Sequence, residues 1–447
     1  MFIPHTNADR EAMLKTIGVS SIDALFENLP GCNPASPLKL PSPTTEMEAF
    51  AEISYIASVN ESAQELISFL GAGAYHHYIP AAVDAILQRG EFYTAYTPYQ
   101  PEISQGTLQT VFEFQSLMAA LTGMEVSNAS HYDGATAVAE AINMAYHNFR
   151  GQRKKIILSP ALHPHYKETV HTYTQGTDLH ILGEDLSPSS TPQDLMALID
   201  QETALIVVQY PDFYGRIYDF SALAEAAHNA KALIAIHVNP LSLGILTPPG
   251  EMNADIVTGE GQPLGIPLSF GGPYLGIFTT RQKFVRKMAG RIVGETIDSR
   301  GQRGYVLTLS TREQHIRREK ATSNICTNQG LMVLASTLYL SLLGKHGLAQ
   351  VSNLNYQKAH YAAQQITALP GYELCFETPF FNEFTVRCPI PADELNAHLL
   401  EHDILGGLAL GKTDPDLENC LLIAVTEMNT RQDIDNLVQH LAEIADD

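Results

Sequence analysis

Two short apolar runs, TALIVVQ at residues 203–209 and ALIAIHV at residues 232–238, give the clearest structural signal in this chain. Runs of this length are typical of strands that are buried on both faces of a parallel sheet. Similar runs occur at 155–158, 255–258 and 276–279, and helical stretches separate them. The alternation predicts a mostly parallel α/β sheet with helices on both faces and with ligands at the carboxyl ends of its strands.

The segments on either side of this region have a different pattern. Helix start and stop signals predict helices at 6–17, 22–28 and 47–58, and a longer one that begins after Ser104 and ends at Gly123. Beyond residue 329 we expect a helix at 331–343, then strand, helix, strand and helix at 383–388, 393–401, 420–425 and 433–442. These patterns predict an N-terminal helical segment (1–65), a large α/β domain (66–328) and a small α+β C-terminal domain (329–447).

The composition narrows the class of protein. The 447 residues include 27 Lys+Arg against 49 Asp+Glu, a net charge of −22, which disfavours nucleic-acid and anionic-membrane partners. We find no signal-peptide pattern at the amino terminus and no apolar run of bilayer length, so a cytoplasmic protein is expected. The cysteines are odd in number, scattered and without C-x-x-C pairing, which predicts reduced structural thiols: Cys32, Cys326, Cys375, Cys388 and Cys420.

One turn resembles an anion-binding helix start. The segment 128–137 ends a strand-like run and enters a helix through the small residues Gly134, Ala135 and Thr136. Backbone N–H groups at such a helix start attract phosphate, although an ordinary helix end capped by Asp133 explains the same pattern. No G-x-G-x-x-G, P-loop or G-x-S-x-G pattern occurs, so nicotinamide, ATP and serine-hydrolase sites have no support. The histidines at 76–77 and 163–171 lack metal-ligand spacing, and no metal is predicted.

Two further segments have the composition of a binding surface. The stretch 93–106 places tyrosines, glutamines and prolines together, as a small-molecule pocket or a partner surface does, and a structural loop remains an equal alternative. The stretch 281–320 is rich in Arg and Lys. A solvated helix face is the usual meaning of such a run, but in an acidic chain it also marks the place where a carboxylate, a phosphate or an acidic partner would bind.

Several long strings of residues carry a resemblance to a known family. They are FLGAGAY at 69–75, HYIP at 77–80, YTAYTPYQPEISQG at 93–106, TPPG at 247–250, GEGQP at 259–263 and TREQHIRREKATSNICT at 311–327. Together they resemble the glycine cleavage system P protein, in particular the alpha subunit of its two-chain form. The resemblance implies a fold-type-I pyridoxal-phosphate-dependent transferase architecture.

The resemblance also exposes a departure from the pattern of a cofactor-binding chain. Such folds hold pyridoxal phosphate through a lysine, while an aspartate pairs with the ring nitrogen. Counting back from the glycines at 271–272, the lysine position falls on Gln262, and the aspartate position falls on Asn239. No lysine occurs from 232 to 282. The implication is that pyridoxal phosphate resides on a partner beta subunit and that Gly134, Ala135 and Thr136 are a vestigial phosphate turn.

The function implied by the resemblance is therefore shared between chains. With a beta subunit, the family decarboxylates glycine and transfers its aminomethyl group to the lipoyl group of the H protein. The resemblance implies a complex of two alpha and two beta chains. The residues expected to help complete the shared site are Tyr96, Thr97, Tyr99, Gln100, Gln105, Arg312, Arg318 and Lys320. Two alternatives stay open: a self-sufficient pyridoxal-phosphate aminotransferase or decarboxylase, and a non-catalytic structural partner of the beta chain.

Overall fold

The computed structural model describes residues 4–29, 39–63 and 65–445 and divides the chain into two units, Met1–Glu61 and Ser62–Asp447. The first unit contains α1 (Asn7–Ile17), the 3-10 helix η1 (Asp23–Phe26) and α2 (Glu46–Ala57). The capping box predicted at Thr45 and Glu48 starts α2, and α1 also starts with one, formed by Thr6 and Asp9. The predicted α-helix at 22–28 was wrong, because this short segment has no side-chain cap and forms only a 3-10 turn. Cys32 lies outside the described residues.

A seven-stranded sheet forms the centre of the described part of the second unit, in the order β2-β8-β7-β6-β5-β3-β4. In the part of the sheet ordered β7-β6-β5-β3-β4, neighbouring strands run parallel. At the other edge β8 is antiparallel to β7, and β2 is antiparallel to β8. The prediction of a mostly parallel sheet is confirmed. The strands are β2 (Val126–Ser127), β3 (Lys155–Leu158), β4 (His180–Leu182), β5 (Thr203–Tyr210), β6 (Leu233–Val238), β7 (Ile256–Glu260) and β8 (Gly276–Thr280).

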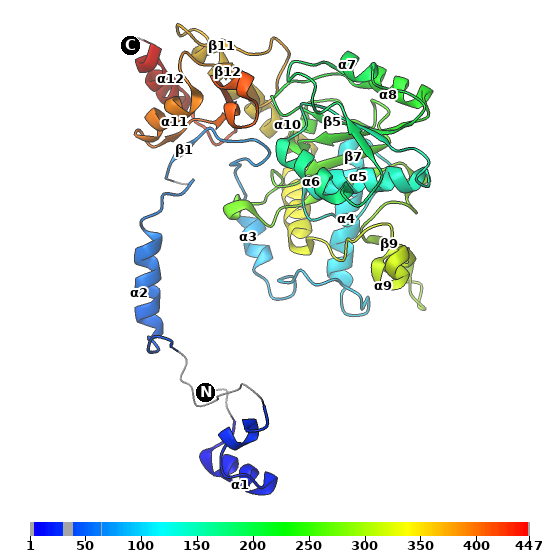
Figure 1. Cartoon of the computed structure of the whole chain (residues 1–447), viewed down its shortest axis with the longest axis vertical. Helices are drawn as coiled ribbons and strands as arrows, with labels where there is room; N and C mark the ends of the chain where they lie inside the picture. The colour runs from blue at the N-terminus through cyan, green and yellow to red at the C-terminus, as the bar shows by residue number, and fades with distance from the viewer. Residues whose placement is uncertain (1–3, 30–38, 64, 446–447) are drawn as a thin grey trace. The chain divides into compact units, whose positions relative to one another are not determined.

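Helices cover both faces of this sheet, which explains the unbroken apolar runs. In β5, Leu205 and Val207 pack into one core cluster with α5 and α6, whereas Ile206 and Val208 pack into another with α8. Successive side chains of a strand point to opposite faces, so a strand covered on both faces needs apolar residues at every position. Figure 1 shows these helices around the strands: α5 (Gly134–Asn148), α6 (Pro164–Thr174), α7 (Pro192–Met196) and α8 (Ser221–Asn229).

A third core cluster joins the β8 side of the sheet to three further helices and a hairpin. These elements are α3 (Ala81–Leu87), α4 (Gln105–Thr122), α10 (Gly330–Ile366), β9 (Ile292–Ile297) and β10 (Arg303–Thr308). The helix predicted at 331–343 agrees with the first part of α10, because Gly344, at φ 58°, breaks the helical geometry there, and a second helical part continues to Ile366. By length and composition α10 could span a bilayer, contrary to the expectation from sequence, but 44% of its most apolar window is buried inside the protein.

The C-terminal part has its own antiparallel sheet, in the order β11-β12-β15-β14, with α11 and α12 packed against it. The parallel pair β1–β13 joins residues 67–68 to this part, and Phe69 lies in its core. The alternation of strands and helices agrees with the sequence pattern, whereas the domain boundaries at 65 and 328 stay predictions. The elements are β1 (Ile67–Ser68), β11 (Glu373–Leu374), β12 (Glu383–Arg387), α11 (Ala392–Leu400), β13 (Ile404–Leu405), β14 (Leu408–Ala409), β15 (Cys420–Ala424) and α12 (Arg431–Ala445).

Candidate functional site

The turn that begins α5 lies at the carboxyl end of the parallel sheet, where ligands of this fold class bind. Asp133 is the N-cap residue: its Oδ1 accepts a hydrogen bond from the backbone N–H of Thr136 at 2.7 Å. The backbone N–H group of Gly134, the first residue of α5, donates to Glu260 Oε2 at 2.9 Å. Both acceptors belong to the protein, so the helix start has carboxylate partners of its own.

Glu260 ends β7 and holds its carboxylate at the N-terminus of α5. The backbone N–H groups of Gln262 and Leu275 donate to its Oε1 at 3.0 and 3.1 Å. Burial raises the pKa of Glu260 to about 7, against the lowering effect of these N–H groups. The positive end of a helix dipole is where an anion binds most favourably, and here a side-chain carboxyl group occupies that place.

Aromatic rings close the space beside this carboxyl group. His237, at the end of β6, lies 4.8 Å from the Tyr166 ring, and Tyr166 stacks on His163 at 4.6 Å. A Cβ atom at Gly134 would lie 2.9 Å from His237 Cε1 and 3.0 Å from the Tyr166 hydroxyl oxygen, so only glycine fits there. Burial lowers the pKa of His237 to about 3 and that of His163 to about 4, which keeps both rings neutral.

The remaining space is a cavity of about 370 Å³ under the segment 72–74. Its ionisable lining includes the acidic Asp133 and Glu260, and no lysine is among the described residues that line it. Glu383 fastens the covering segment, because its carboxyl oxygens accept from the Ala72 N–H at 2.6 Å and the Tyr75 hydroxyl at 2.5 Å. Burial raises the pKa of Glu383 to about 7.

Gln262 is buried, with 1% of its surface exposed, and its amide is used entirely within the protein. Oε1 accepts from the Tyr75 N–H at 2.8 Å, and Nε2 donates to the carbonyl oxygens of Tyr75 at 2.9 Å and Ile266 at 2.8 Å. Asn239 caps a 3-10 helix through the Leu241 N–H at 3.1 Å. Both residues that the sequence placed at cofactor positions therefore form hydrogen bonds with the backbone of this chain.

A second group of residues joins the 93–106 stretch to the Arg-rich segment. Arg291 Nη2 donates to the Tyr99 hydroxyl at 2.6 Å and lies 3.4 Å from Glu313 Oε2. The guanidinium carbon is 5.3 Å from the centre of the Tyr99 ring, and the His315 ring lies 6.0 Å from that ring. The side chains of Arg291 and Glu313 are almost fully buried, so this ion pair is a fixed junction between the two segments.

Three of the residues predicted for the site hold these segments in place. Thr97 Oγ1 lies 3.3 Å from Thr327 Oγ1, and Gln105 exchanges two hydrogen bonds of 2.9 Å with the backbone of Tyr305. Arg312 donates to the carbonyl oxygens of Leu309, Gly290 and Met288. Their donors and acceptors are thus directed into this chain, toward its own backbone and side chains.

The other predicted residues face outward. Tyr96 is 78% exposed, and Gln100, Arg318 and Lys320 are exposed as well. Tyr99 stands between the two sets, half-exposed but bonded to Arg291. The structure therefore brings Thr97 to Thr327 at the end of the 311–327 segment, and Tyr99 to His315 near its start, with the Tyr96 ring 6.3 Å from that of Tyr99. Among the described contacts none joins Gln100, Arg318 and Lys320 to one another.

Sequence reasoning missed the residues that fill the cavity and the buried cation. Glu260 and Gln262 lie in the quoted GEGQP string, yet only Gln262 was singled out. His163 was weighed only as a metal ligand, and Arg291 only as one cation in a basic run. His237 is a polar residue inside an apolar strand, and this is the one local signal that could have pointed to it.

Comparison with known proteins gives a consistent result over the whole chain. Residues 1–441 match the family described as Glycine cleavage system P-protein. A protein of Thermomicrobium roseum named "Probable glycine dehydrogenase (decarboxylating) subunit 1" is 53% identical over 445 residues, 99% of each chain. A crystal structure of glycine decarboxylase (P-protein) in inhibitor-bound form has a TM-score of 0.90 and 39% identity, covering 99% of this chain and 100% of that one. A sphingosine-1-phosphate lyase of Burkholderia pseudomallei shares the fold, with a TM-score of 0.65 at 15% identity over 92% and 93% of the two chains.

Proposed function

The chain belongs to the glycine cleavage system P-protein family, and from that premise we propose that it is the subunit of a heteromeric glycine decarboxylase that does not anchor the cofactor. Its relatives carry the designation "subunit 1", which implies a second subunit in the same complex. The activity that follows is decarboxylation of glycine by the assembled enzyme. This reading accounts for a chain that has the complete family fold but lacks the lysine of a self-sufficient enzyme.

Pyridoxal phosphate is the cofactor of the enzymes that share this fold, and it supplies the electron sink that decarboxylation needs. We propose that it resides on the partner subunit, because the cavity of this chain does not fit it. The observation that carries the proposal is the pair Glu260 and Gln262: a carboxyl group fills the anion position at α5, and a fully bonded amide replaces the amine. A phosphate group at that place would meet the Glu260 and Asp133 carboxyl groups, and its charge would be repelled.

The part of this chain that we assign to the shared site is the exposed surface around Tyr96 and Lys320. Tyr96, Gln100, Arg318 and Lys320 extend outward, where a second chain can meet them. In that contact the cations would attract the glycine carboxylate, and the tyrosine and amide groups would position the substrate or the lipoyl arm and exclude water. The buried Arg291–Glu313 pair keeps the surface in a fixed shape.

The designation "subunit 1" of the relatives supports the proposal of a partner chain. We propose two alpha and two beta chains, a lipoylated H protein as the acceptor of the aminomethyl group, and the cytoplasm as the location.

The first experiment locates the cofactor. This chain and the second subunit are purified separately and together, incubated with pyridoxal phosphate, reduced with borohydride and analysed by mass spectrometry. We expect the pyridoxyl group on the second subunit alone. A pyridoxyl group on any lysine of this chain would favour the self-sufficient enzyme instead.

The second experiment tests the contribution of this chain to catalysis. Tyr96→Ala and Gln100→Ala should reduce the release of carbon dioxide from carboxyl-labelled glycine by the assembled complex, while size-exclusion chromatography shows intact assembly. Leu182→Ala is a suitable control, because Leu182 is an exposed apolar residue on β4, at the opposite edge of the sheet from β2. Normal activity of both Tyr96 and Gln100 variants would identify this chain as a structural partner only.

A further inference from the structure

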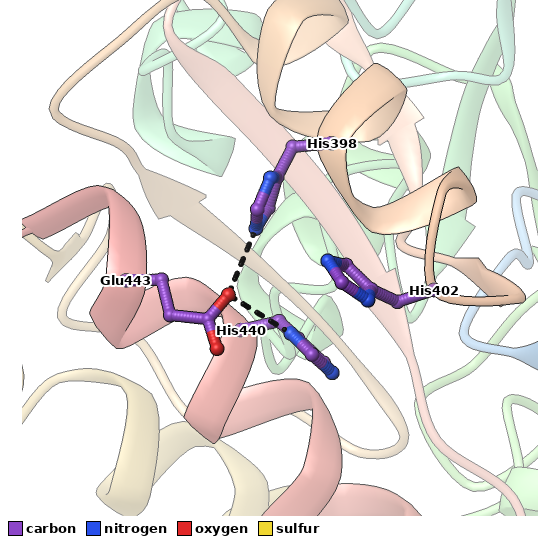
Figure 2. Close-up of side chains that lie close together, drawn as sticks. All are labelled: His398, His402, His440 and Glu443. Carbon is purple, nitrogen blue, oxygen red and sulfur yellow. Dashed lines mark hydrogen bonds and ion pairs between the residues drawn. The ribbon is translucent and has the colours of Figure 1, made fainter.

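Three histidines and a glutamate gather on the outer side of the C-terminal part, away from the residues assigned above. His398 lies in the last turn of α11, and His402 follows four residues later. His440 and Glu443 lie three residues apart on α12. Figure 2 shows the four side chains near one another, two from α12, one from the end of α11 and His402 from the turn that follows it. Residues three apart share one helix face, so α12 presents His440 and Glu443 together.

The position of this cluster is fixed by the core beneath it. Leu395 and Leu399 of α11 pack in one apolar cluster with Ile434, Leu437 and Leu441 of α12. A packed apolar contact between two helices sets their distance and rotation closely. The polar group above it therefore has a defined geometry before any ligand binds.

The distances within the cluster suit a small cation. One donor atom from each of the four residues can be chosen so that all lie within 4.8 Å of one another. His440 Nδ1 lies 3.1 Å and His398 Nε2 lies 3.4 Å from Glu443 Oε2. A tetrahedral zinc ion with bonds of about 2.1 Å separates neighbouring donor atoms by roughly 3.4 Å. Two of the separations already match, and a small movement of the exposed His402 side chain brings in the last donor.

A cation would replace the hydrogen bond between His440 Nδ1 and Glu443 Oε2 and would meet an unbonded nitrogen at His398. His398 Nε2 is buried and forms no hydrogen bond; it lies within ion-pair distance of Glu443 without hydrogen-bond geometry. The rings of His402 and His440 stack at 3.8 Å. Among the described residues the ion-pair partners of Glu443 are His398 and His440, with neither a lysine nor an arginine.

We propose that His398, His402, His440 and Glu443 form a binding site for a divalent transition-metal ion, with zinc as the ion that fits best. Imidazole nitrogens with one carboxylate are the donor set of zinc and its neighbours in the first transition row, whereas magnesium and calcium prefer oxygen donors. Four protein ligands leave no open position, so the site is structural and not catalytic.

The expected role of the ion is to join α11, α12 and the turn before β13. His402 lies two residues before Ile404, which pairs with Ile67 of β1. The strand β1 leads into the segment that covers the Glu260 cavity. A metal bound at His402 therefore stabilises the anchor of that segment at the C-terminal sheet, independently of the function proposed above.

The test uses the full-length chain without an affinity tag, freed of metal by a chelator and titrated with zinc chloride in a calorimeter at neutral pH. We expect one zinc ion per chain, a rise in melting temperature on binding, and tetrahedral absorption bands when cobalt(II) replaces zinc. Glu443→Gln and His402→Gln change exposed side chains and should weaken zinc binding on the order of 100-fold.

His171→Gln provides a matched control, because His171 lies exposed on α6, away from α11 and α12, and contacts the carboxylate of Glu184 at 2.9 Å. Its affinity for zinc should equal that of the wild-type chain. Equal zinc affinity in wild type, His402→Gln and Glu443→Gln, or the absence of zinc binding by wild type, would overturn the proposal.

Discussion

Replacing Gln262 with leucine measures how much the position of the segment around Tyr75 depends on this amide. Leucine is similar in size, so the change removes polar contacts and leaves little empty volume. The Tyr75 N–H, the Tyr75 carbonyl and the Ile266 carbonyl would each lose a partner in a buried place. An unsatisfied buried group costs about 1–3 kcal/mol, and burying a leucine side chain returns about 1.5–3 kcal/mol. We expect a net loss of about 3 kcal/mol in the stability of this region.

Hydrogen exchange followed by mass spectrometry measures this loss locally, on the peptide that contains Tyr75. A loss of about 3 kcal/mol corresponds to roughly 100-fold faster exchange through opening of the segment. Gln109→Leu is the control, since the Gln109 amide contacts only Glu113 on the exposed face of α4, and such changes stay within about 0.5 kcal/mol. Equal exchange at Tyr75 in wild type and Gln262→Leu would refute the reasoning that the amide fastens this segment.

Three other changes test the same region and the core beside it. Gln262→Lys should not gain a borohydride-trapped pyridoxyl group, because the side chain at 262 is directed to the backbone of Tyr75 and Ile266 and Glu260 fills the anion position. A pyridoxyl mass increment on residue 262 would contradict this. The pKa of Glu383 is raised to about 7 in the folded chain from about 4.5 in the unfolded chain, so the folded state binds the extra proton and the free energy of unfolding falls as pH rises from 4.5 to 7. Glu383→Gln should flatten this slope in denaturation measured over that pH range. An unchanged slope would contradict the assignment. Arg216→Ala leaves the buried Asp212 carboxyl group without its ion-pair partner at 2.7 Å and should lower the free energy of unfolding by about 3–5 kcal/mol in guanidinium denaturation, whereas a loss below about 1 kcal/mol would show that the pair contributes little.

The sheet could be predicted from sequence because its strands satisfy a strict local requirement. A strand covered on both faces, such as β5 or β6, is apolar along most of its length, and that pattern is visible without tertiary information. The caps of α1 and α2 are equally local, since Thr6 with Asp9 and Thr45 with Glu48 lie three residues apart. The first part of α10 was predicted to its end before Gly344, whereas the second part, from the kink to Ile366, was not predicted.

The candidate site could be predicted only in part, because its contacts join distant segments. Gln262 was found through the resemblance, but its partner Tyr75 is 187 residues away, so the bonding of the amide could not be read from local pattern. Arg291 meets Tyr99 across 192 residues, and a basic run does not reveal which cation is buried. The assignment of Tyr96, Gln100, Arg318 and Lys320 to a shared site remains a prediction that the experiments above decide.

The carboxyl group of Glu260 at the start of α5 has a consequence for how this subunit depends on the cofactor. Where a bound anion occupies a helix start, part of the local stability depends on that anion. Here a carboxyl group of the chain itself occupies the helix start, so removing pyridoxal phosphate should leave the stability of this chain unchanged. On the function proposed above, loss of the cofactor would then destabilise the second subunit alone.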